Sequence, residues 1–413
     1  MLQSGFGLLA LVLLAWLMSE NRGKVRISGV AIGVGLQLIL GLLMLKVPIF
    51  EQIFLGLNSV ALAIEKATMA GTSFVFGYLG GGPLPFEEPY PGAGFILAFR
   101  ALPIILIMSV ISAVLYYWRV LPVIVSAFSY CLEKTMKIGG ALGVGAASNI
   151  FVGMVEAPLM VKPYLGRMTR SELFTIMTCG MATIAGTMLV LYASILAPVI
   201  PNAMGQILAA SIISAPAAIL IARVMVPETA KHMTEGSIVP PREAASTMDA
   251  VTLGTSDGIK ILLNVVAMLL VLVALVSLIN AGLAFLPDVM GAPLTLQRML
   301  GWIMAPVVWL IGIPWAEAQT AGTLMGTKTI LNEFLAYLEL AKLEPGVLSE
   351  RSRVIMTYAM CGFANFGSLG IMIGGLSVMA PQRRDEIVQL GAKSIISGTL
   401  ATLMTGAVVG VIL

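Results

Sequence analysis

The sequence has few charged residues and few of the side chains that build metal centres or disulfides. Only 11% of its 413 residues are Asp, Glu, Lys or Arg, whereas soluble domains carry about 25%. So little charge cannot cover the surface of a water-soluble fold of this length. The chain contains one histidine, His232, and three cysteines, Cys131, Cys179 and Cys361, in no even or closely spaced set. The composition therefore predicts neither a metal cluster nor a disulfide framework.

Long apolar runs are what the sequence has in abundance. Apolar residues make up 58% of the chain, and a run of about 20 of them can cross a bilayer as a helix. We therefore predict an all-α polytopic membrane protein with about eight transmembrane helices. The predicted spans are residues 4–19, 27–47, 100–118, 173–196, 205–226, 259–285, 352–378 and 391–413.

The distribution of Lys and Arg predicts how these spans are oriented. The first span has no basic region before it and a basic cluster after it, which favours a retained span with its N-terminus outside over a signal peptide. Cytoplasmic loops carry an excess of Lys and Arg, and the loops predicted inside do so here. Their basic residues are Arg22, Lys24, Arg26, Arg119, Lys134, Lys137, Lys162, Arg167, Arg170, Arg223, Lys231, Arg242, Arg383, Arg384 and Lys393. The alternation also places the C-terminus outside.

Two further apolar segments, 138–161 and 304–333, fit this alternation only if each enters and leaves on the same side. Polar or helix-breaking residues interrupt both segments, namely several glycines with Asn149, Glu156, Pro314, Glu317, Lys328 and Glu333. Irregular backbone at membrane depth occurs where it lines a cavity or is covered by protein, and such segments in both halves indicate a central binding site. We predict two re-entrant helical hairpins; ordinary spans with a few polar residues would spoil the alternation.

A short motif recurs after each interrupted segment. Residues 179–185 read CGMATIA and residues 361–367 read CGFANFG, and each motif follows an intramembrane glutamate. Together with the opposite predicted orientations, this match predicts two inverted repeats, 138–226 and 304–413.

Glu156 and Glu333 are the sharpest candidates for a functional site. An ionisable group at a membrane helix centre costs about 2.5–3.5 kcal/mol and is therefore a functional hypothesis by default. Each could instead be a structural carboxylate, satisfied by helix N-termini or by Lys328. Uncharged polar groups in the broken regions could bind Na⁺ or a polyhydroxylated solute, or could simply join helices; these are Asn149, Thr183, Asn365 and Ser368.

Several stretches resemble the concentrative nucleoside transporters, which are sodium-coupled nucleoside symporters. They are Asn149–Gly153 (NIFVG) with Glu156–Leu159 (EAPL), Ala182–Thr187 (ATIAGT), Asn332–Phe334 (NEF) and Cys361–Ser368 (CGFANFGS). Weaker similarity runs from residue 20 to residue 400. The resemblance implies a homotrimer of multi-pass subunits in a bacterial inner membrane. Each subunit would have a scaffold and a transport domain that moves as an elevator.

The same resemblance implies a division of the chain and a role for individual residues. Residues 1–137 would hold N-terminal spans, interfacial segments and a scaffold helix, 138–226 and 304–413 the transport domain, and 227–303 a cytoplasmic loop and a scaffold span. Glu333, Asn365 and Ser368 would bind the ribose, with Phe363 packed beside the nucleoside. The remaining expected substrate residues are Met154, Val155, Glu156 and Met188. Asn149, Val152, Thr183 and Ile184 would bind Na⁺, the expected coupling ion, through two side-chain oxygens and backbone carbonyls.

One position departs from the family's pattern. The first hairpin usually reads Gly-Gln-Thr/Ser-Glu, and the Gln and Thr/Ser meet the nucleobase edge. This chain has Met154 and Val155 there, whose side chains cannot donate the hydrogen bonds that an amide and a hydroxyl supply. We therefore expect atypical base recognition, with purines, a modified base or another ligand as the options.

Rival functions remain open on the sequence. Within transport, the chain could be driven by protons or carry another ribose-bearing solute. A channel would need a continuous polar lining, whereas the polar residues here cluster at two interruptions. An enzyme would show a nucleophile–base set or a metal cluster, and the sequence displays neither. A basic stripe for nucleic acid is also lacking.

Overall fold

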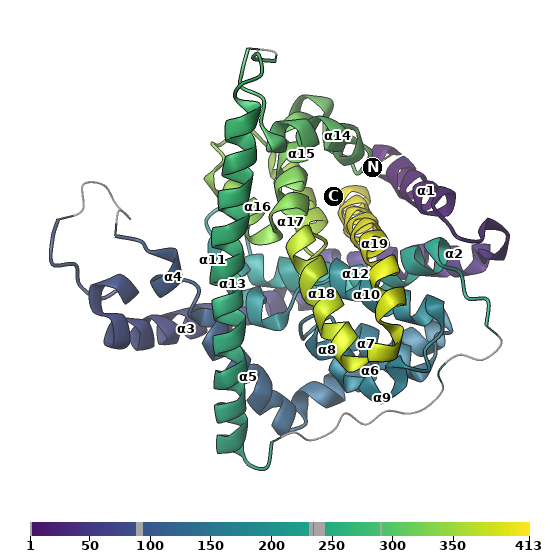
Figure 1. Ribbon diagram of the computed structural model, residues 1–413, viewed down its shortest axis with the longest axis horizontal. Helices are drawn as coiled ribbons and strands as arrows, with labels where there is room; N and C mark the ends of the chain where they lie inside the picture. The colour runs from purple at the N-terminus through teal and green to yellow at the C-terminus, as the bar shows by residue number, and fades with distance from the viewer. Residues whose placement is uncertain (1, 88–93, 231–233, 235–243, 290) are drawn as a thin grey trace.

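The computed structural model of the chain describes residues 2–87, 94–230, 234, 244–289 and 291–413 (Figure 1). Lys231, His232 and Arg242 lie outside the described residues. The regular structure is helical, which confirms the all-α prediction. In chain order the α-helices are α1 (Leu2–Leu17), α2 (Ile27–Lys46), α3 (Pro48–Phe76), α4 (Leu97–Arg100), α5 (Ile104–Tyr117), α6 (Val120–Met136), α7 (Gly140–Ser148), α8 (Glu156–Met160), α9 (Lys162–Leu165), α10 (Arg170–Ala182), α11 (Gly186–Leu196), α12 (Ala203–Met225), α13 (Thr247–Leu283), α14 (Leu296–Leu310), α15 (Trp315–Ile330), α16 (Glu333–Lys342), α17 (Glu350–Met360), α18 (Phe366–Met379) and α19 (Arg384–Ile412).

Several of these helices are long and apolar enough to cross a membrane, as the sequence predicts. Among the described residues, seven helical segments meet that condition: Ile27–Lys46, Pro48–Gly80, Leu97–Tyr117, Arg170–Leu196, Ala203–Met225, Thr247–Leu283 and Pro381–Ile412. Shorter apolar helices accompany them, including α1 and α18.

Two predicted spans are not continuous helices. Residues 173–196 divide into α10 and α11, and residues 352–378 divide into α17 and α18. In the second case Asn365 caps α18, its side chain accepting a hydrogen bond from the backbone N–H of Ser368 at 2.7 Å. An Asn that can accept this bond favours starting a new helix over continuing the old one. The break falls within an apolar run, so a hydropathy window passes over it.

The long helix α3 was not among the predicted spans. Glu51, Glu65 and Lys66 interrupt its apolar run, so the window from 48 to 76 looks too polar to be singled out. Only 17% of its most apolar window is buried in the protein. In Figure 1, α3 runs across the direction of α13 and extends away from the bundle.

The buried core lies among α10, α12 and α19, whereas α13 is peripheral. The apolar windows of α12 and α19 are each 89% buried, and that of α13 is only 6% buried. Helices α1 and α2 pack on α12 and α19, while α5 packs along α13 (Figure 1). The exposed apolar face of α13 is what a helix in contact with lipid or a neighbouring subunit needs. This arrangement places α13 and α5 against one side of the broken helices.

Candidate functional site

Four interruptions of helical structure among the described residues meet inside the protein. They are residues 149–155 between α7 and α8, 183–185 between α10 and α11, 331–332 between α15 and α16, and 361–365 between α17 and α18. Backbone hydrogen bonds join the interruptions at 149–155, 183–185 and 361–365. The N–H of Gly186 donates to Phe151 O at 3.1 Å, and the N–H of Phe363 donates to Thr183 O at 3.3 Å. The backbone groups freed by unwinding are thus partly satisfied by the other interruptions.

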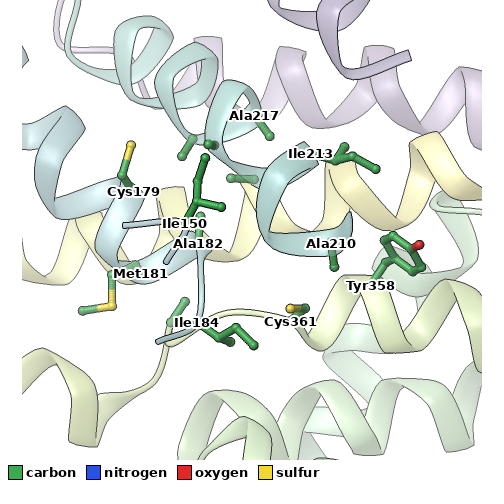
Figure 2. Close-up of a cluster of buried hydrophobic side chains, with 14 of the residues drawn as sticks. Ile150, Cys179, Met181, Ala182, Ile184, Ala210, Ile213, Ala217, Tyr358 and Cys361 are labelled. Atoms are coloured by element: carbon green, nitrogen blue, oxygen red, sulfur yellow. The ribbon is translucent and has the colours of Figure 1, made fainter. Parts of the chain in front are cut away.

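The close approach of these backbones depends on glycine. A Cβ on Gly186 would lie 2.2 Å from Phe151 O, and a Cβ on Gly362 would lie 2.9 Å from the carbonyl of Ala182. Figure 2 shows the stretch after Ala182 crossing the stretch after Cys361, with the side chain of Ile184 at the crossing. Because apolar side chains pack closely around this point, the crossing is buried and rigidly framed.

Helix polarity divides the meeting point into two electrostatically different regions. Asn149 and Thr183 are the C-cap residues of α7 and α10, so two helix C-termini point toward them. By contrast, Glu156 and Glu333 open α8 and α16, and Asn365 is the N-cap of α18. Helix C-termini carry partial negative charge and favour a cation, whereas N-termini favour acidic groups.

A cavity of about 180 Å³ lies where the N-termini of α8, α16 and α18 meet, and α13 bounds its far side. All eight residues predicted for the substrate site line it: Met154, Val155, Glu156, Met188, Glu333, Phe363, Asn365 and Ser368. They come from four separate stretches of the chain, namely 154–156, 188, 333 and 363–368. The wall from α13 is mainly apolar, with Asn264 as a polar exception. A cavity with convergent polar groups at one end and apolar walls suits a small amphipathic solute.

Glu333 is the most constrained polar group in this cavity. Its side chain is 3% exposed, and it accepts hydrogen bonds from the hydroxyl of Tyr192 at 2.5 Å and from Nδ2 of Asn365 at 3.1 Å. Lys328 is fully buried on α15, and its Nζ has no hydrogen-bond partner in the part of the chain that the structure describes. The Glu333 carboxyl group is therefore held in one orientation by the two donors, Tyr192 and Asn365.

Glu156 is the first residue of α8, directly after the 149–155 interruption, and it faces two cavities. It lines the cavity already described and an adjoining one, which α5 and α13 also line. Its carboxylate folds over Gly153, where a Cβ would lie 2.1 Å from Oε2. Met154 packs at a similarly close point, 2.9 Å from where a Cβ on Gly180 would be. The 149–155 interruption is thus packed closely against α10.

The residues predicted to bind a cation lie at or near the C-termini of α7 and α10. Asn149, Thr183 and Ile184 are buried, and Val152 is partly buried. Thr183 Oγ1 donates to Cys179 O at 2.9 Å, which leaves its lone pairs available. Asn149 Nδ2 donates to Gly145 O at 3.0 Å, but Asn149 Oδ1 is buried without a hydrogen-bond partner among the described residues. A buried oxygen left without a donor, beside helix C-termini, fits a bound cation.

Sequence reasoning missed several cavity residues, above all Tyr192, Thr187 and Asn264. Tyr192 and Asn264 lie within continuous apolar stretches of α11 and α13, and only the three-dimensional register turns them toward the cavity. The signal was weak but present, since a hydroxyl or an amide in an apolar helix needs a partner.

Replacing Tyr192 with phenylalanine tests this contact. The change leaves one lone pair of the Glu333 carboxylate without its donor, and an unsatisfied buried acceptor costs about 1–3 kcal/mol. We expect the dissociation constant of the solute that occupies this cavity to rise by about fivefold or more. Tyr337→Phe is the matched control, because the Tyr337 hydroxyl donates to Thr357 O and its ring lies 5.3 Å from that of Tyr192. Equal changes of the dissociation constant in the two variants would contradict a specific role for Tyr192.

Comparisons with known proteins agree along nearly the whole chain. The family described as "Na+ dependent nucleoside transporter C-terminus" matches residues 206–410, and its N-terminal counterpart matches residues 6–79. A family described as "Nucleoside recognition" matches residues 98–199.

Individual proteins give the same result. The nucleoside permease NupC of Helicobacter pylori is 34% identical over 98% of this chain and 96% of its own length. The uncharacterized transporter YutK of Bacillus subtilis is 38% identical over 98% and 97% of the two chains. The structure of CNTnw in an inward-facing substrate-bound state superposes with a TM-score of 0.91 at 37% identity, covering 100% of this chain and 97% of that one.

Proposed function

The chain belongs to the concentrative, Na⁺-dependent nucleoside transporter family, and we propose that it imports nucleosides by symport with sodium. As a member it is a multi-pass membrane transporter and not an enzyme. The observation that carries the proposal is the convergence of eight predicted residues on one cavity, with Glu333 oriented at its polar end. Import would be driven by a sodium gradient across a bacterial inner membrane.

We propose that the ribose binds at the polar end of the cavity. Glu333 and Asn365 are already hydrogen-bonded to each other, and Ser368 lies on the first turn of the helix that Asn365 caps. Carboxylate, amide and hydroxyl groups in this arrangement offer both acceptors and donors to sugar hydroxyls. Phe363 would pack against the nucleoside, and Met188 would close the apolar side.

For the coupling ion, Asn149 and Thr183 would supply side-chain oxygens, and Val152 and Ile184 would supply carbonyls. Bound Na⁺ would neutralise the partial negative charge of the two helix C-termini. Phe151 and Thr183 are linked through backbone hydrogen bonds to α11 and to the 361–365 interruption. An ion that fixes these segments would therefore help to shape the nucleoside cavity, which is a physical route for coupling.

We further propose an elevator movement and a homotrimer. The moving body would comprise 138–226 and 304–413, and α5 and α13 would form the scaffold. Helices α1 and α2 would travel with the moving body because they pack on α12 and α19. The second cavity, between the first hairpin and α5 and α13, would then be the route by which substrate leaves.

Uptake into proteoliposomes tests the function directly. With an inward sodium gradient, we expect saturable accumulation of radiolabelled adenosine or uridine, recovered chemically unchanged. Choline in place of sodium should abolish accumulation. If a pH gradient replaces sodium without loss of rate, the coupling ion is a proton. If no nucleoside accumulates or competes, the chain carries another solute.

The base end of the cavity leads to a separate prediction. Met154 and Val155 line the cavity where the family usually has an amide and a hydroxyl. Apolar pockets discriminate by only about 1–3 kcal/mol for an added or missing group, whereas hydrogen-bonding pockets discriminate far more. We expect broad base tolerance, with purine nucleosides competing at least as well as uridine against labelled adenosine.

The double change Met154→Gln with Val155→Thr should sharpen selectivity toward pyrimidines and leave the dependence on ribose unchanged. Both changes nearly conserve side-chain volume, and Val155 has little room for a larger side chain because it packs against Gly375. Met160→Gln changes a methionine of the second cavity, the proposed exit route, and should leave base selectivity unchanged whatever its effect on rate. Strict pyrimidine selectivity in the wild type would show that the base argument is wrong, even if the transporter assignment stands.

A further inference from the structure

A third cavity lies where α2 begins and α6 and α12 end, away from the nucleoside and cation sites. Its volume is about 310 Å³, compared with about 180 Å³ for the nucleoside cavity. Its described lining comes from three stretches, 24–32, 135–137 and 220–230. These stretches belong to three loops that the charge distribution places on the cytoplasmic side. Three segments distant in sequence thus build one cavity on the predicted inner face.

Positive charge dominates this cavity. Its described lining contains four cations and one carboxylate, namely Lys24, Arg26, Lys137, Arg223 and Glu228. Glu228 is already engaged, because it accepts hydrogen bonds from Oγ1 of Thr169 at 2.6 Å and from the N–H of Ala230 at 3.0 Å. Lys24, Arg26 and Lys137 form no ion pair within the described part of the chain. The cavity therefore holds an excess of exposed positive charge that an anion would balance.

The backbone adds to this preference for an anion. Helix α2 starts in the cavity, with Ser28 and Gly29 of its first turn in the lining. Its N-cap residue is Arg26, whose carbonyl accepts from the N–H of Gly29 at 3.0 Å and of Val30 at 3.2 Å. The Arg26 side chain cannot accept from the N–H groups of Ile27 and Ser28. A 20-residue helix presents partial positive charge at this end. An acceptor from outside the chain would satisfy these donors.

Lys137 is held at the rim in an uncommon conformation. Its φ is 51°, in the left-handed region that glycine usually occupies after a helix. Arg223 fixes this end of α6, because its Nη1 donates to Met136 O at 3.0 Å and to Lys137 O at 3.4 Å. A lysine costs more conformational energy than glycine at this φ, and we interpret its presence as a sign that the exposed ammonium binds a ligand.

We propose that this cavity binds the phosphate headgroup of an anionic phospholipid from the cytoplasmic leaflet. The choice of a lipid rests on the apolar edge of the cavity. Ile32 is 41% exposed in the lining, and Val25 and Val30 are partly buried in the same lining. A phospholipid places its phosphate among the cations and its glycerol and acyl carbons along these side chains. Free phosphate would leave the apolar edge uncovered.

Native mass spectrometry of the purified protein, titrated with phosphatidylglycerol or phosphatidylcholine, tests the proposal. We expect phosphatidylglycerol to be retained selectively, and millimolar inorganic phosphate not to displace it. Arg26→Gln and Lys137→Gln should each weaken retention by about fivefold, since a Lys or Arg near an anionic surface contributes about that factor. Lys134→Gln is the matched control, because Lys134 lies on the same helix but stacks on Tyr130 outside the cavity.

Three results would overturn the proposal: equal retention of the two lipids, displacement by inorganic phosphate, or the same loss in Lys134→Gln as in Lys137→Gln. Displacement by phosphate would indicate a site for a soluble anion. Monodisperse protein with the thermal unfolding temperature of the wild type shows that the variants fold. Because retention of lipid is measured without transport, the outcome does not depend on the proposed substrate or coupling ion.

Discussion

Replacing Glu333 with glutamine is expected to lower nucleoside uptake by at least about tenfold, while the protein still assembles in the membrane. Hydrogen bonds to an ionised carboxylate are roughly twice as strong as neutral ones. Glutamine keeps the size of the side chain but turns one acceptor oxygen into a donor. That NH₂ group would face either the Tyr192 hydroxyl or Nδ2 of Asn365, both of which donate to the carboxylate. The substrate would lose an acceptor and the surrounding network its orientation.

Glu339→Gln provides the matched control for this experiment. Glu339 lies on the same helix, α16, and accepts a hydrogen bond from Thr327 at 2.9 Å, but it does not line the nucleoside cavity. The rate of nucleoside uptake by the Glu339→Gln variant should stay near that of the wild type. Initial rates with labelled adenosine, normalised to the amount of protein in the membrane, give the comparison. A wild-type rate in Glu333→Gln would contradict the assignment of this carboxylate to the substrate.

A double variant with Lys328 tests whether Glu333 also stabilises the fold. The Lys328 Nζ is buried without a hydrogen-bond partner among the described residues, and a buried charge there would need a counter-charge such as the Glu333 carboxylate. If the two groups balance each other, Lys328→Gln combined with Glu333→Gln should lose less stability than the two single changes added together. Thermal unfolding of the three variants in detergent measures this coupling. Strict additivity would mean that Lys328 and Glu333 do not stabilise each other.

The candidate site was predictable from sequence to the extent that its residues stand out at membrane depth. Glu156 and Glu333 are conspicuous in apolar segments because burying a carboxylate is costly. The glycines and prolines around them mark interrupted helices, and the structure interrupts both segments. The resemblance to a family then assigned the remaining residues, and all eight line one cavity. Their roles in binding stay predictions.

What the sequence could not predict depends on contacts between distant segments. The break at 183–185 is stabilised by hydrogen bonds with Phe151 and Phe363, and neither partner is visible in the local pattern. The repeated motif also misleads about register. Helix α10 continues three residues past Cys179, whereas α17 ends directly before Cys361. Because an extended stretch of three to five residues hardly changes a hydropathy average, both breaks were read as continuous spans.

Changing Asn149 to leucine or Thr183 to valine is expected to abolish the stimulation of uptake by sodium. Each change removes a side-chain oxygen from the proposed cation site. In Asn149 the lost oxygen is the buried Oδ1, which has no donor within the described residues. Leucine and valine fill similar volumes without a lone pair, so packing is largely kept. Uptake of labelled nucleoside over a range of sodium concentrations, at constant ionic strength with choline, measures the effect.

Thr175→Val separates the loss of an ion ligand from the loss of a buried hydroxyl. Thr175 lies on α10, the helix that Thr183 caps, and is fully buried. Its hydroxyl donates to Ser171 O at 2.7 Å, just as the Thr183 hydroxyl donates to Cys179 O at 2.9 Å. Its valine variant should keep sodium stimulation. In the wild type, sodium should also tighten nucleoside binding by the same factor by which nucleoside tightens sodium binding, because linkage is reciprocal. Equal nucleoside affinity in sodium and choline would count decisively against the site, since an ion that contacts the crossing of 183–185 and 361–365 must alter the cavity that the same segments build.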